Sequence, residues 1–184
     1  WNMERTTETM AASRNWDYRY VWIRDAAFTI YAFLRIGFKE EARCFMAWIE
    51  ERCKQLKDIG SQEGLRVLYD IHGHHPSLDP EIYSETTLDH WEGYRGQGPV
   101  RIGNAAASQV QLDIYGELMD SVYLCDKHVK PISWDFWQAV KEAIVEPVLL
   151  HWKRPDHGIW EIREEPKEYV HSKVMAWVTL DRAI

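Results

Sequence analysis

One short segment near the start of the chain combines carboxylates, guanidinium groups and aromatic rings. Residues 15–25 read NWDYRYVWIRD and lie directly before an apolar stretch. Planar carboxylate and guanidinium groups bind hydroxyls through charge-assisted hydrogen bonds, and Trp or Tyr rings cover the apolar C–H faces of a ligand. This combination predicts a sugar-binding site. The alternative is a buried Arg–Asp network that caps the following helix.

A second segment places one carboxylate beside an indole in a loop that contains glycine. Residues 158–163 read GIWEIR, so Glu161 follows Trp160. An apolar environment favours the protonated form of a carboxyl group, which a general acid needs near neutral pH. Glu161 is therefore a candidate general acid. The alternative is an exposed loop glutamate next to a Trp that anchors the loop.

Two further segments carry weaker signals. Residues 71–75 read IHGHH, but no Cys or carboxylate lies at tight ligand spacing around them, so we expect a polar loop and no metal. The glycines of residues 93–104 lack the phosphate-binding Gly-x-x-x-x-Gly-Lys-Ser/Thr pattern. We expect instead a loop that places Tyr94, Arg95 and Arg101 at a cleft, and we expect no cofactor.

Composition excludes several classes of protein. The net charge is −7 and no run of basic residues occurs, so no nucleic-acid partner is expected. No stretch approaches about 18 consecutive apolar residues, so no membrane span is expected, and residues 1–5 do not resemble a secretory signal. The three cysteines form no Cys-x-x-Cys pair and are typical of a reducing compartment, which weakly favours the cytoplasm. Ten Trp residues are unusual for a chain of 184.

Helices must position these segments, and the spacing of apolar residues predicts where the helices lie. Apolar residues recur at helical spacing in five places, with Gly37 as a stop, Asn104 and Ser133 as N-caps, and Pro147 as a kink. Residues 65–69 alternate like a brief strand. The predicted helices span residues 24–36, 39–56, 104–126, 133–152 and 172 to the end of the chain, with long loops at 71–103 and 155–166.

The same segments resemble glycoside hydrolase family 15, which contains glucoamylases, glucodextranases and a group of bacterial and archaeal trehalases. Residues 15–25 resemble the family's N-W-D-Y-R-Y-x-W-x-R-D signature, and residues 92–104 its E-G-Y-R-G…P-V-R-x-G-N segment. Residues 158–163 resemble its G-I-W-E-x-R segment, and residues 172–183 complete the set in the same order.

The resemblance implies an all-α fold, part of an (α/α)6 toroid of twelve helices with the pocket among the long loops. It implies hydrolysis of terminal α-glucosidic bonds with inversion, acting on an oligosaccharide or disaccharide. By position, Glu161 resembles the general acid, and Arg24 and Asp25 resemble the pair that binds hydroxyls of the terminal glucose. Trp22 and Trp160 resemble pocket-wall residues, and Arg101 resembles a further pocket arginine.

The chain also departs from the family pattern. Ile162 stands where fungal glucoamylases carry a second carboxylate, and Gly98 stands before Pro99 where a basic residue is common. No segment matches the family's late catalytic base. We therefore expect residues 1–184 to be a fragment of one catalytic domain, with about five helices, inactive without the remainder of that domain. A catalytically inactive glycan-binding relative and a non-enzymatic helical scaffold are the alternatives.

Overall fold

The computed structural model describes residues 15–58 and 64–184, and residues 1–5, on which the expectation about a secretory signal rests, lie outside them. The described chain forms two compact units. One comprises residues 15–20 and 68–108, and the other comprises residues 21–67 and 109–184.

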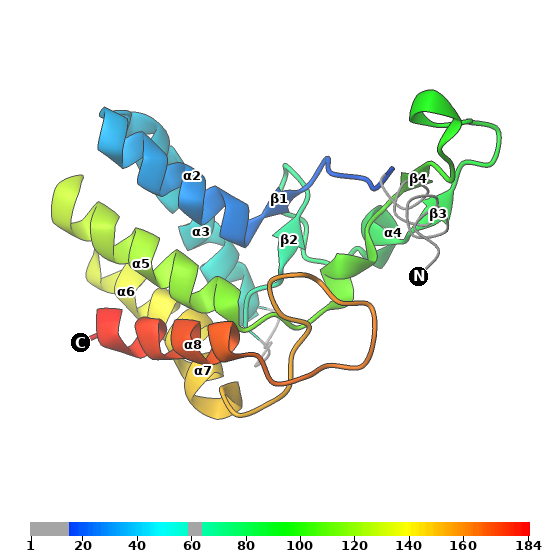
Figure 1. Ribbon diagram of the computed structural model, residues 1–184. Coiled ribbons are helices and arrows are strands. Elements are labelled where there is room, and N and C mark those ends of the chain that lie inside the picture. The colour runs from blue at the N-terminus through cyan, green and yellow to red at the C-terminus, as the bar shows by residue number, and fades with distance from the viewer. Residues whose placement is uncertain (1–14, 59–63) are drawn as a thin grey trace. The chain divides into compact units, whose positions relative to one another are not determined.

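The second unit holds the long helices. Helix α5 packs against α8 and α2, and these three helices lie side by side with α5 in the middle (Figure 1). Helix α3 packs against α2 and against the helix that runs from α6 to α7. The elements of this unit are β1 (Val21–Trp22), α2 (Ile23–Ile36), α3 (Lys39–Asp58), α5 (Asp113–His128), α6 (Trp134–Val140), the π-helical turn η3 (Lys141–Val145), α7 (Glu146–His151) and α8 (Val170–Arg182).

The α2–α3 hairpin forms as the sequence predicts. Gly37 adopts the left-handed conformation with φ of 93°, and its N–H donates to the carbonyl of Phe33. A side chain is disfavoured in this conformation, which is why glycine ends helices in this way. The two-residue connection between α2 and α3 therefore follows directly from one glycine.

The third predicted helix begins nine residues later than expected, so the predicted start at Asn104 is wrong. The Asn104 side chain does act as a cap, because its Oδ1 accepts the N–H of Ala106 at 3.0 Å, but it caps only the short 3-10 helix η2 (Ala105–Ser108). Helix α5 begins at Asp113, where the carboxylate of Asp156 accepts the N–H of Leu112 at 2.9 Å. A side chain distant in sequence thus occupies the donor that a longer helix would use.

The fourth predicted helix is continuous, and the disturbance expected at Pro147 takes the form of a π-helical turn. Ser133 Oγ accepts the N–H of Phe136 at 3.1 Å, which confirms the predicted cap. The π turn η3 ends at Val145, two residues before Pro147. Its wider turn accommodates a residue that has no N–H to donate.

Helix α8 begins at Val170, two residues before the predicted start. Ser172 is fully buried, and its hydroxyl donates to Asp156 at 2.8 Å instead of capping the helix. Asp156 also pairs through its backbone with Lys167, which closes the loop that the sequence predicts at 155–166. One buried carboxylate therefore joins this loop to the starts of α5 and α8.

The first unit consists of short elements, so the long loop predicted at 71–103 is not irregular throughout. Strands β3 and β4 pair antiparallel, with Thr86 opposite Ile102 and Thr87 opposite Arg101. The elements are β2 (Leu68–Tyr69), α4 (Pro80–Tyr83), β3 (Thr86–Thr87), η1 (Tyr94–Gly96), β4 (Arg101–Ile102) and η2.

The all-α class is confirmed, because every strand among residues 15–58 and 64–184 is two residues long and the core is helical. The three cysteines are free, with Cys53 and Cys125 buried and Cys44 exposed. In the part of the chain that the structure describes, no helix has the length and apolar character needed to cross a bilayer.

Candidate functional site

Glu161 lies where β1 and the start of α2 meet the loop before α8. Its Oε1 accepts hydrogen bonds from Trp22 Nε1 at 2.7 Å and from Arg24 Nη2 at 3.2 Å. The Glu161 side chain is 27% exposed, whereas Trp22 and Arg24 are buried. Of the predicted site residues, the structure thus brings Trp22, Arg24 and Glu161 into direct contact.

The backbone at Glu161 is held in an uncommon conformation. Its φ is 52°, in the left-handed region that few residues other than glycine adopt. Gly158 has φ of 64° in the same turn, and a Cβ there would lie 2.8 Å from the ring of Tyr169. Gln109 Nε2 donates to the carbonyls of Glu161 and Ile162 at 3.3 and 3.4 Å. The surrounding contacts therefore fix the direction in which Glu161 is presented.

Arg24 joins Glu161 to the start of α5. Its Nη1 donates to Asp113 Oδ2 and to Gln111 Oε1, both at 2.8 Å. Burial alone would lower the pKa of Arg24, but its contact with the Asp113 carboxylate outweighs this effect and raises the pKa above the usual value. Arg24 is therefore part of a buried ion pair, as the alternative interpretation of the first motif predicts, and it also contacts the candidate acid.

Two predicted site residues are exposed. Asp25 is exposed in the first turn of α2, one residue after Arg24. The Trp160 side chain is 83% exposed, although the residue directly precedes Glu161. Neither side chain contacts the Trp22–Arg24–Glu161 group through a hydrogen bond among residues 15–58 and 64–184.

Arg101 lies in the first unit, in β4. Its guanidinium stacks on the Trp16 ring with 4.2 Å to the ring centroid, and its Nε lies 3.4 Å from Glu85 Oε1. The same unit ties the early motif to β4, because Asp17 Oδ2 accepts the N–H of Gly103 at 3.0 Å and Asn104 donates to the carbonyl of Asp17. Residues 15–20 and 101–104, which look like two separate motifs in the sequence, support each other here.

Sequence reasoning missed three polar residues beside the site, Gln111, Asp113 and Glu117. Asp113 is fully buried and Glu117 is 6% exposed. Burial raises the pKa of Glu117 to about 8, and the neighbouring Asp113 adds to the effect. The available signal was two acids four residues apart on one face of a helix whose neighbouring positions are apolar.

Asp113, Glu117 and His171 are also close enough to reach one cation, since their potential ligand atoms all lie within 4.8 Å of one another. The Arg24 guanidinium already supplies a positive charge at Asp113. His171 Nε2 lies 3.9 Å from Glu117 Oε1, beyond hydrogen-bond distance. Arg24 thus partners Asp113, whereas neither carboxyl oxygen of Glu117 has a hydrogen-bond partner among the described residues.

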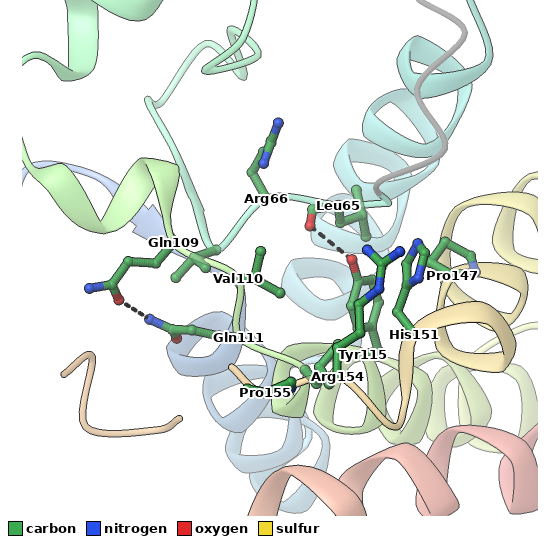
Figure 2. Close-up of a pocket in the computed structure, with 12 residues that line it drawn as sticks. Leu65, Arg66, Gln109, Val110, Gln111, Tyr115, Pro147, His151, Arg154 and Pro155 are labelled. Carbon is green, nitrogen blue, oxygen red and sulfur yellow. Dashed lines mark hydrogen bonds between the residues drawn. The ribbon is translucent and has the colours of Figure 1, made fainter. Parts of the chain in front are cut away.

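A cavity of about 120 Å³ is lined in part by residues 109–112, the segment that carries Gln111 (Figure 2). Leu65, Tyr115 and Pro147 form part of its wall, and Tyr115 donates a hydrogen bond to the carbonyl of Leu65 at 3.2 Å. The basic side chains of Arg154 and His151 line it as well. Glu161 does not line this cavity, so the candidate acid faces a different region of the unit.

Comparison with known proteins agrees with these motifs. A sequence profile described as Glycosyl hydrolases family 15 matches residues 5–184. The trehalases of Mycolicibacterium smegmatis and Thermoplasma acidophilum are each 41% identical, over 175 and 178 residues, which is 95% and 96% of this chain and 25% and 28% of theirs. The trehalase of Mycobacterium tuberculosis is 39% identical over 95% of this chain and 24% of its own length.

The chain therefore spans about a quarter of the length of the curated relatives it matches. No solved structure matches it. Because the family profile covers nearly the whole chain and the characteristic motifs occur in order, this chain belongs to glycosyl hydrolases family 15.

Proposed function

We propose that the protein to which this chain belongs is an inverting, exo-acting α-glucosidase of the α,α-trehalase type. The observation that carries the proposal is the contact of Glu161 Oε1 with Trp22 and Arg24. Trehalose is the favoured substrate because the relatives named above are trehalases. Glucoamylase-like action on α-glucans is the other outcome that a substrate panel would reveal.

In this proposal Glu161 is the general acid that protonates the leaving oxygen. Trp22 and Arg24 both donate to Oε1, so Oε1 serves as the acceptor and Oε2 is available to carry the proton. Among the described residues Oε2 has no hydrogen-bond partner. A carboxyl group with one oxygen fixed and the other available can present its proton in a defined direction.

Inversion also needs a second carboxylate, which activates water roughly 6.5–9.5 Å from the acid. We propose that this base comes from outside residues 1–184, because the relatives are about four times as long as this chain. Asp25, Arg101 and Trp160 are proposed to bind the sugar in the completed domain.

We also propose that residues 1–184 form part of a single (α/α)6 catalytic domain. Large apolar side chains are exposed on α2 and α8, including Phe28, Tyr31, Val174 and Trp177. On each helix the two residues are three positions apart and so share one face, and exposed apolar faces usually mark an interface. We propose that the remaining helices of the domain cover these faces.

The experiment is hydrolysis of trehalose, maltose and isomaltose by the full-length protein and by its Glu161→Gln variant. We expect trehalose to be the preferred substrate, with the variant reduced by about 10²- to 10⁴-fold. Binding without hydrolysis by the wild-type protein would favour an inactive glycan-binding relative. Neither binding nor hydrolysis would favour a helical scaffold.

A further inference from the structure

The two terminal nitrogens of Arg24 bind different residues. Nη1 donates to Asp113 and Gln111, whereas Nη2 contacts Glu161. Asp113 is fully buried and Arg24 is 7% exposed, so water screens this group of charges weakly. The planar guanidinium therefore bridges Asp113 and Glu161. It fixes where the two side chains lie relative to each other, and the charge at Asp113 affects Glu161 through it.

We infer that Asp113 is a positioning residue that holds Arg24 against Glu161 and offsets the positive charge that Arg24 places beside this acid. This inference rests on the proposed role of Glu161 as the acid. A lone guanidinium 3.2 Å from a carboxyl group favours the ionised form, which cannot donate a proton. Asp113 at 2.8 Å from the same guanidinium makes a nearly neutral pair whose field at Glu161 is much weaker.

The segment before α5 provides the frame for this arrangement. Gln111 Nε2 donates to Gln109 Oε1 at 3.0 Å, and Figure 2 shows the two amide side chains joined in this way. Gln109 in turn holds the backbone of Glu161. Residues 109–113 thus contact both Arg24 and the loop that carries Glu161. This one segment therefore fixes the position of Arg24 relative to Glu161.

Other charged groups lie nearby on each packed helix. Asp25 is the neighbour of Arg24 on α2, Glu117 lies one turn after Asp113 on α5, and His171 faces Glu117 from α8. Burial keeps Glu117 protonated at neutral pH. Among the described residues Asp113 is the carboxylate bonded to Nη1, and it is therefore the charge whose removal Arg24 would feel most directly.

The test is the pH dependence of kcat/KM for trehalose in the full-length protein, with two substitutions of opposite charge effect. Asp113→Asn removes the negative charge and keeps the shape, so we expect the alkaline limb to move to lower pH by about one unit or more. Gln111→Glu places a second carboxylate beside Arg24 Nη1 and removes the donor to Gln109, so we expect lower activity overall but a limb that moves to higher pH. A residue with a merely structural role would lower activity without moving the limb.

The Glu161→Gln variant distinguishes a failure of the proposed function from a failure of the inference about Asp113. Wild-type activity in that variant would overturn the proposed function itself. If Glu161→Gln is inactive while the limbs of Asp113→Asn and Gln111→Glu coincide with that of the wild type, only the inference about Asp113 is overturned. Should Asp113→Asn fail to fold, the direction of the shift in Gln111→Glu decides alone.

Discussion

The buried acid Glu117 makes a quantitative prediction about stability. Burial raises its pKa from 4.5 to about 8, so the folded protein binds this proton more tightly than the unfolded chain does. Between these two values the folded state is protonated while the unfolded state is ionised. The free energy of unfolding therefore falls as pH rises from about 4.5 to about 8, and this loss is complete above pH 8.

Replacing Glu117 by Gln removes the titrating group and keeps its size. Each pH unit between the two pKa values is worth about 1.4 kcal/mol. The Glu117 carboxyl group therefore makes the free energy of unfolding of the wild type about 3 kcal/mol lower at pH 7 than at pH 4.5. The variant lacks this loss. We therefore expect the difference in free energy of unfolding between the variant and the wild type to grow by about this amount from pH 4.5 to pH 7.

The assay is urea unfolding of the full-length protein and the variant at intervals from pH 4.5 to 8. The slope of the free energy of unfolding against pH is the decisive quantity. The amide of the variant does not titrate, so it changes that free energy by the same amount at every pH. Glu41→Gln on the exposed surface of α3 is the matched control, and its curve should run parallel to that of the wild type. Parallel curves for Glu117→Gln and the wild type would refute the reasoning.

Three further substitutions test individual contacts. Trp22→Phe removes the hydrogen bond to Glu161, and we expect kcat to fall about tenfold, a loss of about 1.4 kcal/mol; an unchanged kcat would argue against the contact. Gly116→Ala would place a Cβ 2.2 Å from the carbonyl of Met175, so calorimetry should show a loss of about 1–3 kcal/mol. Asp156→Ala leaves its buried hydrogen-bond donors without an acceptor, and a loss of about 3 kcal/mol is expected in the same measurement; wild-type melting temperatures would contradict both estimates.

The long helices were predictable because their signals are local. Gly37 and Ser133 act within a few residues of their own positions, as the sequence indicates. The start of α5 was not predictable, because it depends on Asp156, more than forty residues away. The short pairing of β3 and β4 was missed for a similar reason, since strands of two residues carry no periodic pattern.

The candidate site was predictable in part. The motifs identify Trp22, Arg24 and Glu161, and the structure brings these three together. Asp113 and Glu117 escaped notice because charged residues in a helix are usually exposed. Their burial follows from the packing of α5 between α2 and α8.

The most direct test of the account is the dependence of the Glu161→Gln variant on the leaving group. Trehalose needs a proton on its leaving oxygen, whereas α-glucosyl fluoride releases fluoride with little need for an acid. If Glu161 is the general acid, the full-length variant should lose about 10²- to 10⁴-fold in kcat/KM on trehalose and keep activity within about tenfold on the fluoride. Equal losses on both substrates, or no loss on trehalose, would contradict that role.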